Sequence, residues 1–262
     1  MLAIDIHDLC FAYENREVLH NINLEIEEGD FAIVVGPNGG GKTTLLKLML
    51  GLLQPKYGRI TVFGVPPAQA RRQIGYVPQS LAYDPKVPIS VLDLALMGRV
   101  DRHRFGAFDR SDRQAALQAL HEVGLDDCAE RPFADLSGGQ RQRALIAQAV
   151  AAAPRLLLLD EPCANIDADG SQTIHRLLKR LNERLTIVMV SHNLGLVEVS
   201  ARHVICVNHT ADMHRLAEVS AADQQKGDWV HLSHKDCPVT HGADENLCDT
   251  PHRGAPAQSQ TT

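Results

Sequence analysis

One segment constrains the fold of this chain more than any other: Gly36-Pro37-Asn38-Gly39-Gly40-Gly41-Lys42-Thr43, which matches the pattern G-x-x-x-x-G-K-[ST]. The apolar run 31–35 before it predicts a buried strand, and the run Thr44–Leu50 after it predicts a helix. Glycines let backbone N–H groups turn toward phosphate oxygens, and a helix N-terminus adds partial positive charge. The segment, with Thr44 beside it, therefore indicates a nucleotide-phosphate site rather than a glycine-rich turn that binds nothing.

Two side chains of this phosphate loop (residues 36–43) have a direct chemical task. Lys42 is expected to reach the β- and γ-phosphates of the nucleotide. The Thr43 hydroxyl is expected to hold Mg²⁺. The loop therefore predicts a nucleotide together with Mg²⁺ as its ligands.

The composition of the 262-residue chain limits its partners and its place in the cell. A net charge of −6 argues against a general affinity for nucleic acid, which needs clustered Lys and Arg. The first residues lack the basic and then apolar layout of a signal peptide, and no uncharged apolar run reaches the roughly 18–20 residues that span a bilayer. We therefore expect a cytosolic protein with mostly reduced cysteines, and any role at a membrane requires a partner.

The pattern of apolar residues predicts an α/β body with a helical insertion. Period-two alternation over 2–6 and 22–26 predicts antiparallel strands near the N-terminus. Near-continuous apolar runs at 156–159 and 186–190 predict parallel strands that are covered on both faces. The stretch 80–134 between these regions is mostly helical in character, and we interpret it as a helical lobe inserted in the body.

The clearest helix of this lobe is predicted over 112–123. Ser111 is expected to cap its N-terminus. Leu117, Leu120 and Val123 are expected to form one apolar stripe along it.

Polar residues follow the two central strands: Asp160-Glu161 comes after the first and Ser191-His192 after the second. Open α/β sheets bind ligands at the carboxyl ends of their strands, so both pairs are candidate site residues. A last strand is predicted over 203–207, and a polar tail follows it.

A further motif, Leu136-Ser137-Gly138-Gly139-Gln140, opens a predicted helix between the phosphate loop and Asp160-Glu161. In this order the motifs closely resemble those of ATP-binding cassette (ABC) ATPases, and the resemblance covers residues 2–207. It implies an α/β fold: a P-loop NTPase core with a mixed sheet, an N-terminal antiparallel β subdomain and an inserted α-helical subdomain at about 80–134. The ATPase domain would span 1–220 and the polar tail 221–262.

The resemblance implies a role in ATP hydrolysis for four residues that match the motifs of the family. Asp160 would hold Mg²⁺, and Gln79 would contact the metal and the attacking water. Glu161 would polarise that water for in-line attack, and His192 would contact the γ-phosphate. Phosphoryl transfer needs positioning and charge neutralisation more than covalent chemistry, which agrees with these side chains.

The resemblance also implies a head-to-tail dimer with two ATP molecules between the subunits. The signature segment (residues 136–140) of one subunit would contact, through Ser137–Gln140, the nucleotide on the phosphate loop of the other. Asp167 would lie in the loop that crosses to the partner. Tyr13 would stack on adenine, whereas without the family pattern it would be an ordinary hairpin aromatic. One chain alone is then expected to hydrolyse ATP poorly.

Two positions depart from the usual family pattern. Gly40 stands where serine is common, which is expected to loosen the loop without removing Lys42 or Thr43. Cys163 stands where threonine is usual, and we interpret it as a small buried residue.

An ABC ATPase without a membrane-spanning segment would drive a separate permease. Segments Pro88–Asp93 and Leu96–Arg99 look like those of ABC importers for zinc, manganese or iron, and importers of metal chelates such as siderophores or cobalamin are the alternative. The implied partners are a second ATPase subunit, a multi-span permease on whose inner side the ATPase sits, and an extracytoplasmic substrate-binding protein. A permease loop is expected to dock on 80–99, so that charge reversal at Arg99 would impair transport and spare basal ATPase activity.

Two other classes of protein stay open on the sequence. Soluble ABC ATPases act in DNA repair or translation, but they usually have a long coiled-coil insertion or two cassettes in one chain, and this sequence has neither. A metal-binding regulatory protein that uses ATP as a switch is the third class, and an intact Glu161 argues against it.

The tail holds four side chains of metal-ligand type at close spacing: His231, His234, Cys237 and His241. Cys and His side chains can complete a tetrahedral zinc site. Their spacing misses the standard zinc signatures, so a disordered polar tail is the favoured interpretation. The alternative hypothesis is a site that binds a divalent metal and damps the ATPase.

Overall fold

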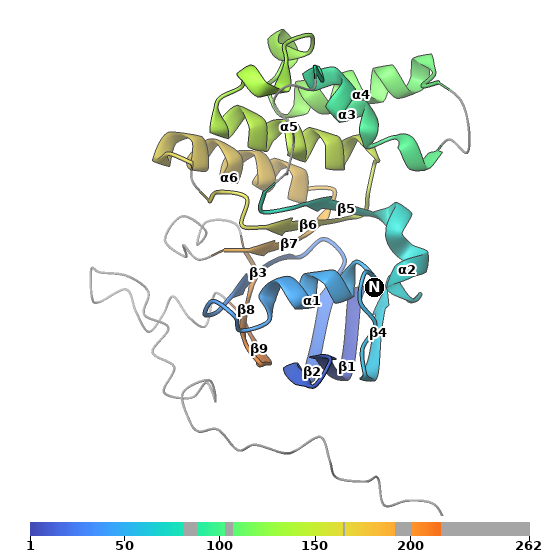
Figure 1. Cartoon of the computed structure of the whole chain (residues 1–262), viewed down its shortest axis with the longest axis vertical. Coiled ribbons are helices and arrows are strands. Elements are labelled where there is room, and N and C mark those ends of the chain that lie inside the picture. Colours follow the sequence, from blue (N-terminus) through green and yellow to red (C-terminus); the bar gives the residue numbers. More distant parts are fainter. Residues whose placement is uncertain (81–87, 103–106, 165, 192–200, 216–262) are drawn as a thin grey trace, which may run out of the picture.

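A computed structural model describes residues 1–80, 88–102, 107–164, 166–191 and 201–215 of the chain. Within these ranges the strands form two sheets, one of three strands and one of six (Figure 1). No helix of the described ranges is both long enough and apolar enough to cross a membrane.

The six-stranded sheet has the order β5-β6-β7-β3-β8-β9. In that order its strands are Ile74–Val77, Leu156–Asp160, Thr186–Val190, Phe31–Val35, His203–Asn208 and Thr210–Arg215. The first five run parallel to one another, and β9 pairs with β8 antiparallel. The predicted mixed sheet is therefore confirmed, although β9 comes after 203–207, the last strand that the sequence predicted.

Both faces of this sheet are covered, which explains the continuous apolar runs in its central strands. In β3, Phe31, Ile33 and Val35 belong to one hydrophobic core, while Ala32 and Val34 belong to the other. The first core is completed by α5 (Gly138–Ala151) and α6 (Ala168–Asn182), and the second by α1 (Lys42–Met49). The helices α1 and α5 therefore lie on opposite faces of the sheet (Figure 1).

The antiparallel sheet confirms the predicted N-terminal β subdomain. Its order is β2-β1-β4, with the bounds Arg16–Glu27, Leu2–Tyr13 and Tyr57–Val62. Alternate residues such as Ile4, Ile6 and Leu24 are buried in the core that α1 also joins. Two short helices, α2 (Pro67–Ala70) and η1 (Arg71–Gln73), connect this sheet to β5.

A group of helices lies between β5 and β6 in the chain, as predicted. Its longer members are α3 (Val91–Met97) and α4 (Arg110–Glu122), and both pack on α5 (Figure 1). Three short 3-10 helices complete it: η2 (Val100–Arg102), η3 (Asp126–Cys128) and η4 (Phe133–Asp135).

The helix α4 begins two residues earlier than predicted, and Asp109 rather than Ser111 is its N-cap. The Asp109 carboxylate accepts from the Asp112 N–H at 2.9 Å, and the Asp112 carboxylate accepts from the Asp109 N–H at 3.0 Å. The Ser111 hydroxyl instead donates to Asp109 at 2.7 Å. Leu117 is 42% exposed, so the predicted apolar stripe was wrong at this position. The buried face of α4 runs through Ala116, Ala119 and Leu120, and Leu117 lies beside it.

Arg99 is buried directly after α3, which contradicts the prediction that it offers an exposed charge to a permease. Its Nε donates to Asp112 Oδ1 of α4 at 3.1 Å, and a terminal guanidinium nitrogen donates to the Ala151 carbonyl of α5 at 3.0 Å. The side chain thus joins three helices. Charge reversal here would bury a carboxylate against Asp112 and would disrupt the helices themselves.

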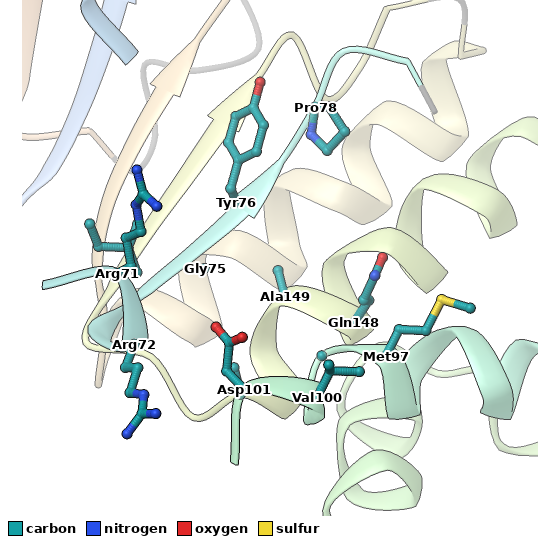
Figure 2. A pocket seen from close by; sticks show the side chains of 13 residues that line it. Arg71, Arg72, Gly75, Tyr76, Pro78, Met97, Val100, Asp101, Gln148 and Ala149 are labelled. Atoms are coloured by element: carbon teal, nitrogen blue, oxygen red, sulfur yellow. The ribbon is translucent and has the colours of Figure 1, made fainter. Parts of the chain in front are cut away.

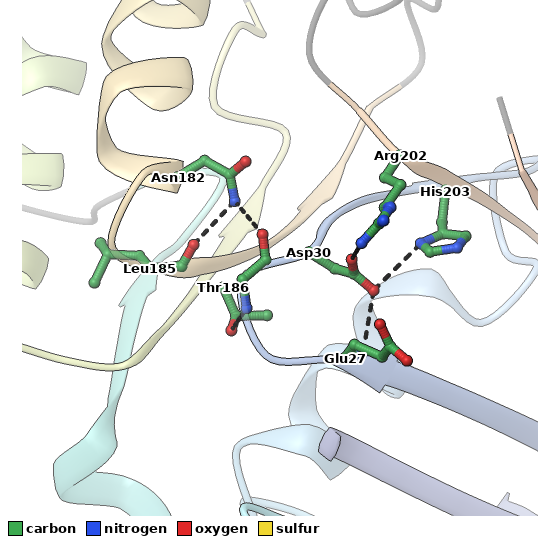
Figure 3. A network of polar contacts seen from close by, with 8 residues as sticks. Glu27, Asp30, Asn182, Leu185, Thr186, Arg202 and His203 are labelled. Atoms are coloured by element: carbon green, nitrogen blue, oxygen red, sulfur yellow. Dashed lines mark hydrogen bonds and ion pairs between the residues drawn. The ribbon is translucent and has the colours of Figure 1, made fainter. Parts of the chain in front are cut away.

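A buried carboxylate, that of Asp30, lies at the amino end of the six-stranded sheet (Figure 3). Asp30 comes directly before β3 and is only 2% exposed. It accepts hydrogen bonds from the Glu27 N–H and from the Arg202 guanidinium, both at 3.1 Å. His203 Nδ1 lies 3.4 Å from its second oxygen.

Asn182, at the end of α6, adds a second set of contacts to the same end of the sheet (Figure 3). Its side-chain amide donates to the carbonyls of Gly29 at 3.0 Å and Leu185 at 2.9 Å. The Gly29 N–H in turn donates to the Thr186 hydroxyl at 3.0 Å. These bonds hold the start of β3 next to the start of β7.

Candidate functional site

Four parallel strands carry polar residues at their carboxyl ends, which form one edge of the six-stranded sheet. The phosphate loop follows β3, Gln79 follows β5, Asp160 ends β6 before Glu161, and Ser191 follows β7. Gln79 Nε2 donates to Glu161 Oε2 at 2.8 Å, across 82 positions of sequence. The structure therefore joins two of the predicted catalytic residues at the edge where open α/β sheets bind ligands.

Lys42, the first residue of α1, is buried beneath the phosphate loop. Its ammonium donates to the carbonyls of Gly36 at 2.9 Å and Pro37 at 2.8 Å, so the lysine side chain contacts the first residues of the loop to which it belongs. Burial lowers the pKa of Lys42, and the nearby carboxylates of Glu161 and Asp160 oppose that shift. An amine between a loop of backbone N–H groups and two carboxylates is well placed to receive phosphate oxygens.

Asp160 lies at the carboxyl end of β6 and is 3% exposed. Burial raises the pKa of Asp160, and a hydrogen bond with the Thr43 side chain opposes that shift. Its Oδ1 is enclosed and has no hydrogen-bond partner among the described residues. A buried carboxylate oxygen without a partner, next to a threonine hydroxyl, is an oxygen donor set that fits Mg²⁺.

Glu161 has a backbone φ of 51°, in the left-handed region that residues other than glycine rarely adopt. Its N–H donates to the Val190 carbonyl of β7 at 3.1 Å, which fixes this unusual turn. Backbone strain of this kind persists where the surrounding structure imposes it, and it concentrates at functional sites. The turn points the Glu161 carboxylate toward Gln79 rather than along the strand.

The signature segment forms the N-terminus of α5. Ser137 is the N-cap, and its hydroxyl accepts from the Gln140 N–H at 3.3 Å while Gln140 Oε1 accepts from the Ser137 N–H at 3.0 Å. Ser137 and Gly138 are exposed. The first turn of α5 therefore presents its hydroxyl and N–H groups to the outside of the subunit.

Asp167 caps the neighbouring helix α6 by accepting from the Gly170 N–H at 2.8 Å. The signature segment lies beside this cap, because a Cβ atom placed on Gly139 would be 3.7 Å from Ile166 Cγ2. The structure thus brings together the two segments for which a contact with a partner subunit was predicted.

Tyr13 ends β1 and is 42% exposed. Its ring meets the Phe11 ring edge-to-face, with centroids 4.8 Å apart and an interplanar angle of 87°. Phe11 therefore fixes the orientation of Tyr13 and leaves part of its ring accessible, as a stacking role requires.

Some predicted site residues lie outside the described ranges: His192 and the tail residues His231, His234, Cys237 and His241. Their roles stay predictions. Cys163 is described and half-buried, with its Sγ 4.0 Å from His175 Nδ1. Burial raises the pKa of the Cys163 thiol, which agrees with the interpretation of a small packing residue.

A groove of about 750 Å³ separates β5 from the helices α3 and α5 (Figure 2). Met97 and Val100 line it and are 46% and 52% exposed. Charged and polar side chains surround these apolar ones: Arg71, Arg72, Tyr76, Asp101 and Gln148. Part of the groove falls within the predicted docking stretch 80–99. The arginines and Gln148 belong to no sequence motif, so the sequence could not predict that they line a groove. Only Met97 and Val100, two apolar side chains that are exposed, offered a sign of this surface.

Residues 19–164 match the family described as ABC transporter. The chain belongs to this family. It is 42% identical over 222 residues to a probable metal transport system ATP-binding protein of Chlamydia pneumoniae, with 83% of this chain and 90% of that protein covered. It is 38% identical over 208 residues to the zinc import ATP-binding protein ZnuC of Pseudomonas fluorescens, with 78% of this chain and 73% of that protein covered.

Among solved structures, this ABC ATPase is similar to one described as an inward-facing conformation of a putative metal-chelate type ABC transporter. The TM-score is 0.76 at 33% sequence identity, and the match covers 84% of this chain and 85% of that one. The fold and the ATPase class predicted from the sequence are both confirmed by these matches.

Proposed function

We propose that this ABC ATPase binds ATP with Mg²⁺ on the phosphate loop and hydrolyses it to drive an importer for a divalent metal ion. One observation carries the site: Gln79 holds the Glu161 carboxylate beside Asp160, whose buried Oδ1 has no partner among the described residues. The names of the Chlamydia and Pseudomonas relatives support metal as the cargo.

Each residue of this edge has a distinct task in the proposed reaction. Lys42 and the N–H groups at the start of α1 bind the β- and γ-phosphates. Asp160 and Thr43 are the residues that fit Mg²⁺, which when bound neutralises charge on the phosphates. Glu161 orients the attacking water in line with the γ-phosphorus, and Gln79 sets the direction of the Glu161 carboxylate.

The substitution Glu161→Gln tests the hydrolytic part of the proposal. The variant should keep MgATP binding within about twofold and lose hydrolysis by a factor on the order of 100 or more, because an amide orients water less strongly than a carboxylate. Turnover and the Kd for ATP are measured on the same preparation. Glu183→Gln, the same chemical change at the exposed C-cap residue of α6, is the control. An undiminished rate in the Glu161 variant would remove this residue from catalysis.

We further propose a head-to-tail dimer with ATP between the subunits. The exposed N-terminus of α5, beside the Asp167 cap, supports it because helix N-termini bind phosphate groups. The Glu161→Gln protein should sediment as a dimer with MgATP and as a monomer without it. Ser137→Arg in the same background should abolish the dimer while each subunit still binds ATP. A monomer at saturating ATP, with the permease also present, counts against the dimer.

The groove beside β5 is the proposed docking site for a permease segment, which would hold the ATPase at the inner face of the membrane. Two exposed apolar side chains, Met97 and Val100, are surrounded by charged ones there, as in protein interfaces. Val100→Asp should leave the ATPase rate of the isolated subunit unchanged and lower transport by the assembled system about tenfold or more. The exposed Leu52→Asp, outside the groove, is the control. Normal transport by the Val100 variant would exclude this face.

The cargo is tested by uptake in cells that carry the complete transporter. Zinc, manganese and iron ions are compared with cobalamin and a ferric siderophore, each with the native ATPase and with Glu161→Gln. We expect only uptake of a free divalent ion to depend on an active ATPase. Uptake of a chelate alone would favour the class named for the solved structure.

A further inference from the structure

The outer wall of the phosphate loop is the backbone at the end of β8. A Cβ atom placed on Gly36 would lie 1.9 Å from the Val207 carbonyl oxygen, and one placed on Gly40 would lie 2.9 Å from it. Neither distance leaves room for a side chain unless the backbone moves. Gly40 therefore does not loosen the loop, as the sequence had led us to expect, because it lets the loop pack closely against β8.

The residue after β8, His209, is bonded to the loop itself. Its N–H donates to the Gly40 carbonyl at 2.9 Å. This bond requires the tight turn between β8 and β9, in which His209 has a left-handed φ of 62°. The turn thus fixes the position of the one loop residue that departs from the usual family pattern.

His209 is also bonded to β2, on the other side of the turn. Its carbonyl accepts from the His20 N–H at 2.8 Å, and its ring Nδ1 lies 3.0 Å from the Val18 carbonyl. A carbonyl oxygen only accepts, so Nδ1 carries the proton in this contact. Gly41 approaches β2 as well, since a Cβ atom on it would be 2.5 Å from Leu19 Cδ2.

The strand β2 pairs with β1, and Tyr13 at the end of β1 pairs with Arg16. His209 therefore links the phosphate loop, through Gly40, with the sheet that carries the proposed adenine contact. No motif includes His209. Its contacts are with Gly40, His20 and Val18, so we expect it to act through the loop and not on the nucleotide.

We propose that His209 is a positioning residue that sets the phosphate loop relative to the adenine-binding sheet and thereby determines ATP affinity. This inference rests on the proposed role of residues 36–43 in binding ATP. Loss of its ring removes the bond to the Val18 carbonyl and leaves the turn held only by the two backbone bonds of His209, so the loop samples more positions that bind phosphate less well. The chemistry of hydrolysis, at Glu161 and Asp160, is left intact.

The variant His209→Ala should raise the KM for ATP about fivefold to tenfold, the equivalent of one lost hydrogen bond and some added loop freedom, with kcat within about twofold of the native value. His209→Asn should restore the native KM, because asparagine tolerates a left-handed φ and its side-chain amide can donate to the Val18 carbonyl. Gly40→Ser should raise the KM at least as much as His209→Ala, because its side chain meets Val207.

Kd for MgATP, KM, kcat and the urea midpoint are measured on the full chain. The control is Asp8→Ala, an exposed residue of β1 that also has a left-handed φ, of 48°, and does not contact the loop. Failure of the native protein to bind MgATP would overturn the proposed function and this inference with it. A native protein that binds MgATP, with an unchanged KM in His209→Ala or with only a lower urea midpoint, would overturn the inference alone.

Discussion

The six-stranded sheet has a buried carboxylate at each of its two ends, Asp30 before β3 and Asp160 at the end of β6, and the two carboxylates have very different surroundings. At the amino end, Asp30 is 2% exposed and has Glu27, Arg202 and His203 around its two oxygens. At the carboxyl end, Asp160 is 3% exposed, and its Oδ1 has no hydrogen-bond partner among the described residues. The two carboxylates are therefore equally buried, but both oxygens of Asp30 have a polar neighbour whereas one oxygen of Asp160 has none among the described residues.

This difference separates a structural carboxylate from one that is kept for a ligand. A buried polar group without a partner costs free energy of folding, and where it lies beside other converging polar residues it indicates a ligand site. Asp30 stabilises the start of β3, and its substitution should affect the folded state. Asp160 destabilises the ligand-free protein, and its substitution should affect chemistry.

The largest expected effect is that of Asp160→Asn on ATP hydrolysis, a loss on the order of 100-fold or more. The same variant should be at least as stable as the native protein at neutral pH without Mg²⁺. Burial raises the pKa of Asp160, so this carboxyl favours the folded state while it is protonated and loses that contribution as pH rises through its folded pKa. Activity and urea unfolding at several pH values between 5 and 8 check both statements. A variant that hydrolyses ATP normally would contradict the assignment of Asp160.

The matched change at the other end, Asp30→Asn, should lower the free energy of unfolding by about 2 kcal/mol, because an amide NH₂ replaces an oxygen that accepts from Arg202 or the Glu27 N–H. The kcat of the folded fraction should stay within about twofold of the native value. Urea unfolding and turnover measured on the same sample separate the two quantities. Loss of turnover at native stability would contradict the distinction between the amino and carboxyl ends of the six-stranded sheet.

The smallest expected effect is that of Asn182→Ala, about 1 kcal/mol of unfolding free energy. Its amide bonds to the carbonyls of Gly29 and Leu185 are lost, but the Gly29 contact is exposed, so water can replace the donor there. ATP turnover should not change. A stability loss as large as that of Asp30→Asn would mean that the two sets of contacts act as one unit, which a double variant would measure.

Local signals predicted much of the fold. The strands β3, β5, β6, β7 and β8 each carry an apolar run bounded by polar or turn residues, and both faces of the sheet are buried. The strand β9 was missed because its sequence, TADMHR, is half-exposed and mostly polar. The strand β9 forms because it pairs with β8, and a pattern of neighbouring residues in the sequence does not reveal such a pairing.

Residues of the candidate site could be predicted where they belong to a sequence motif with a known chemical role, as Lys42, Asp160 and the signature segment do. Contacts between distant segments could not be predicted in this way. Arg99 was expected at the surface because it belongs to the predicted docking stretch 80–99, but it is buried and donates to Asp112 and the Ala151 carbonyl. Nothing in the sequence predicted a role for His209, because its bond to Gly40 depends on how β8 lies beside β3.

The placement of β3 between β7 and β8 has a consequence for the newly made chain. The strand that carries the phosphate loop is complete at Val35, but both of its neighbours come later, at 186–190 and 203–208. At ~5–20 residues per second of synthesis, this interval lasts roughly ten to thirty seconds. During that time both edges of β3 lack their partner strands, so an apolar segment of the growing chain is exposed to aggregation until β7 and β8 have been made.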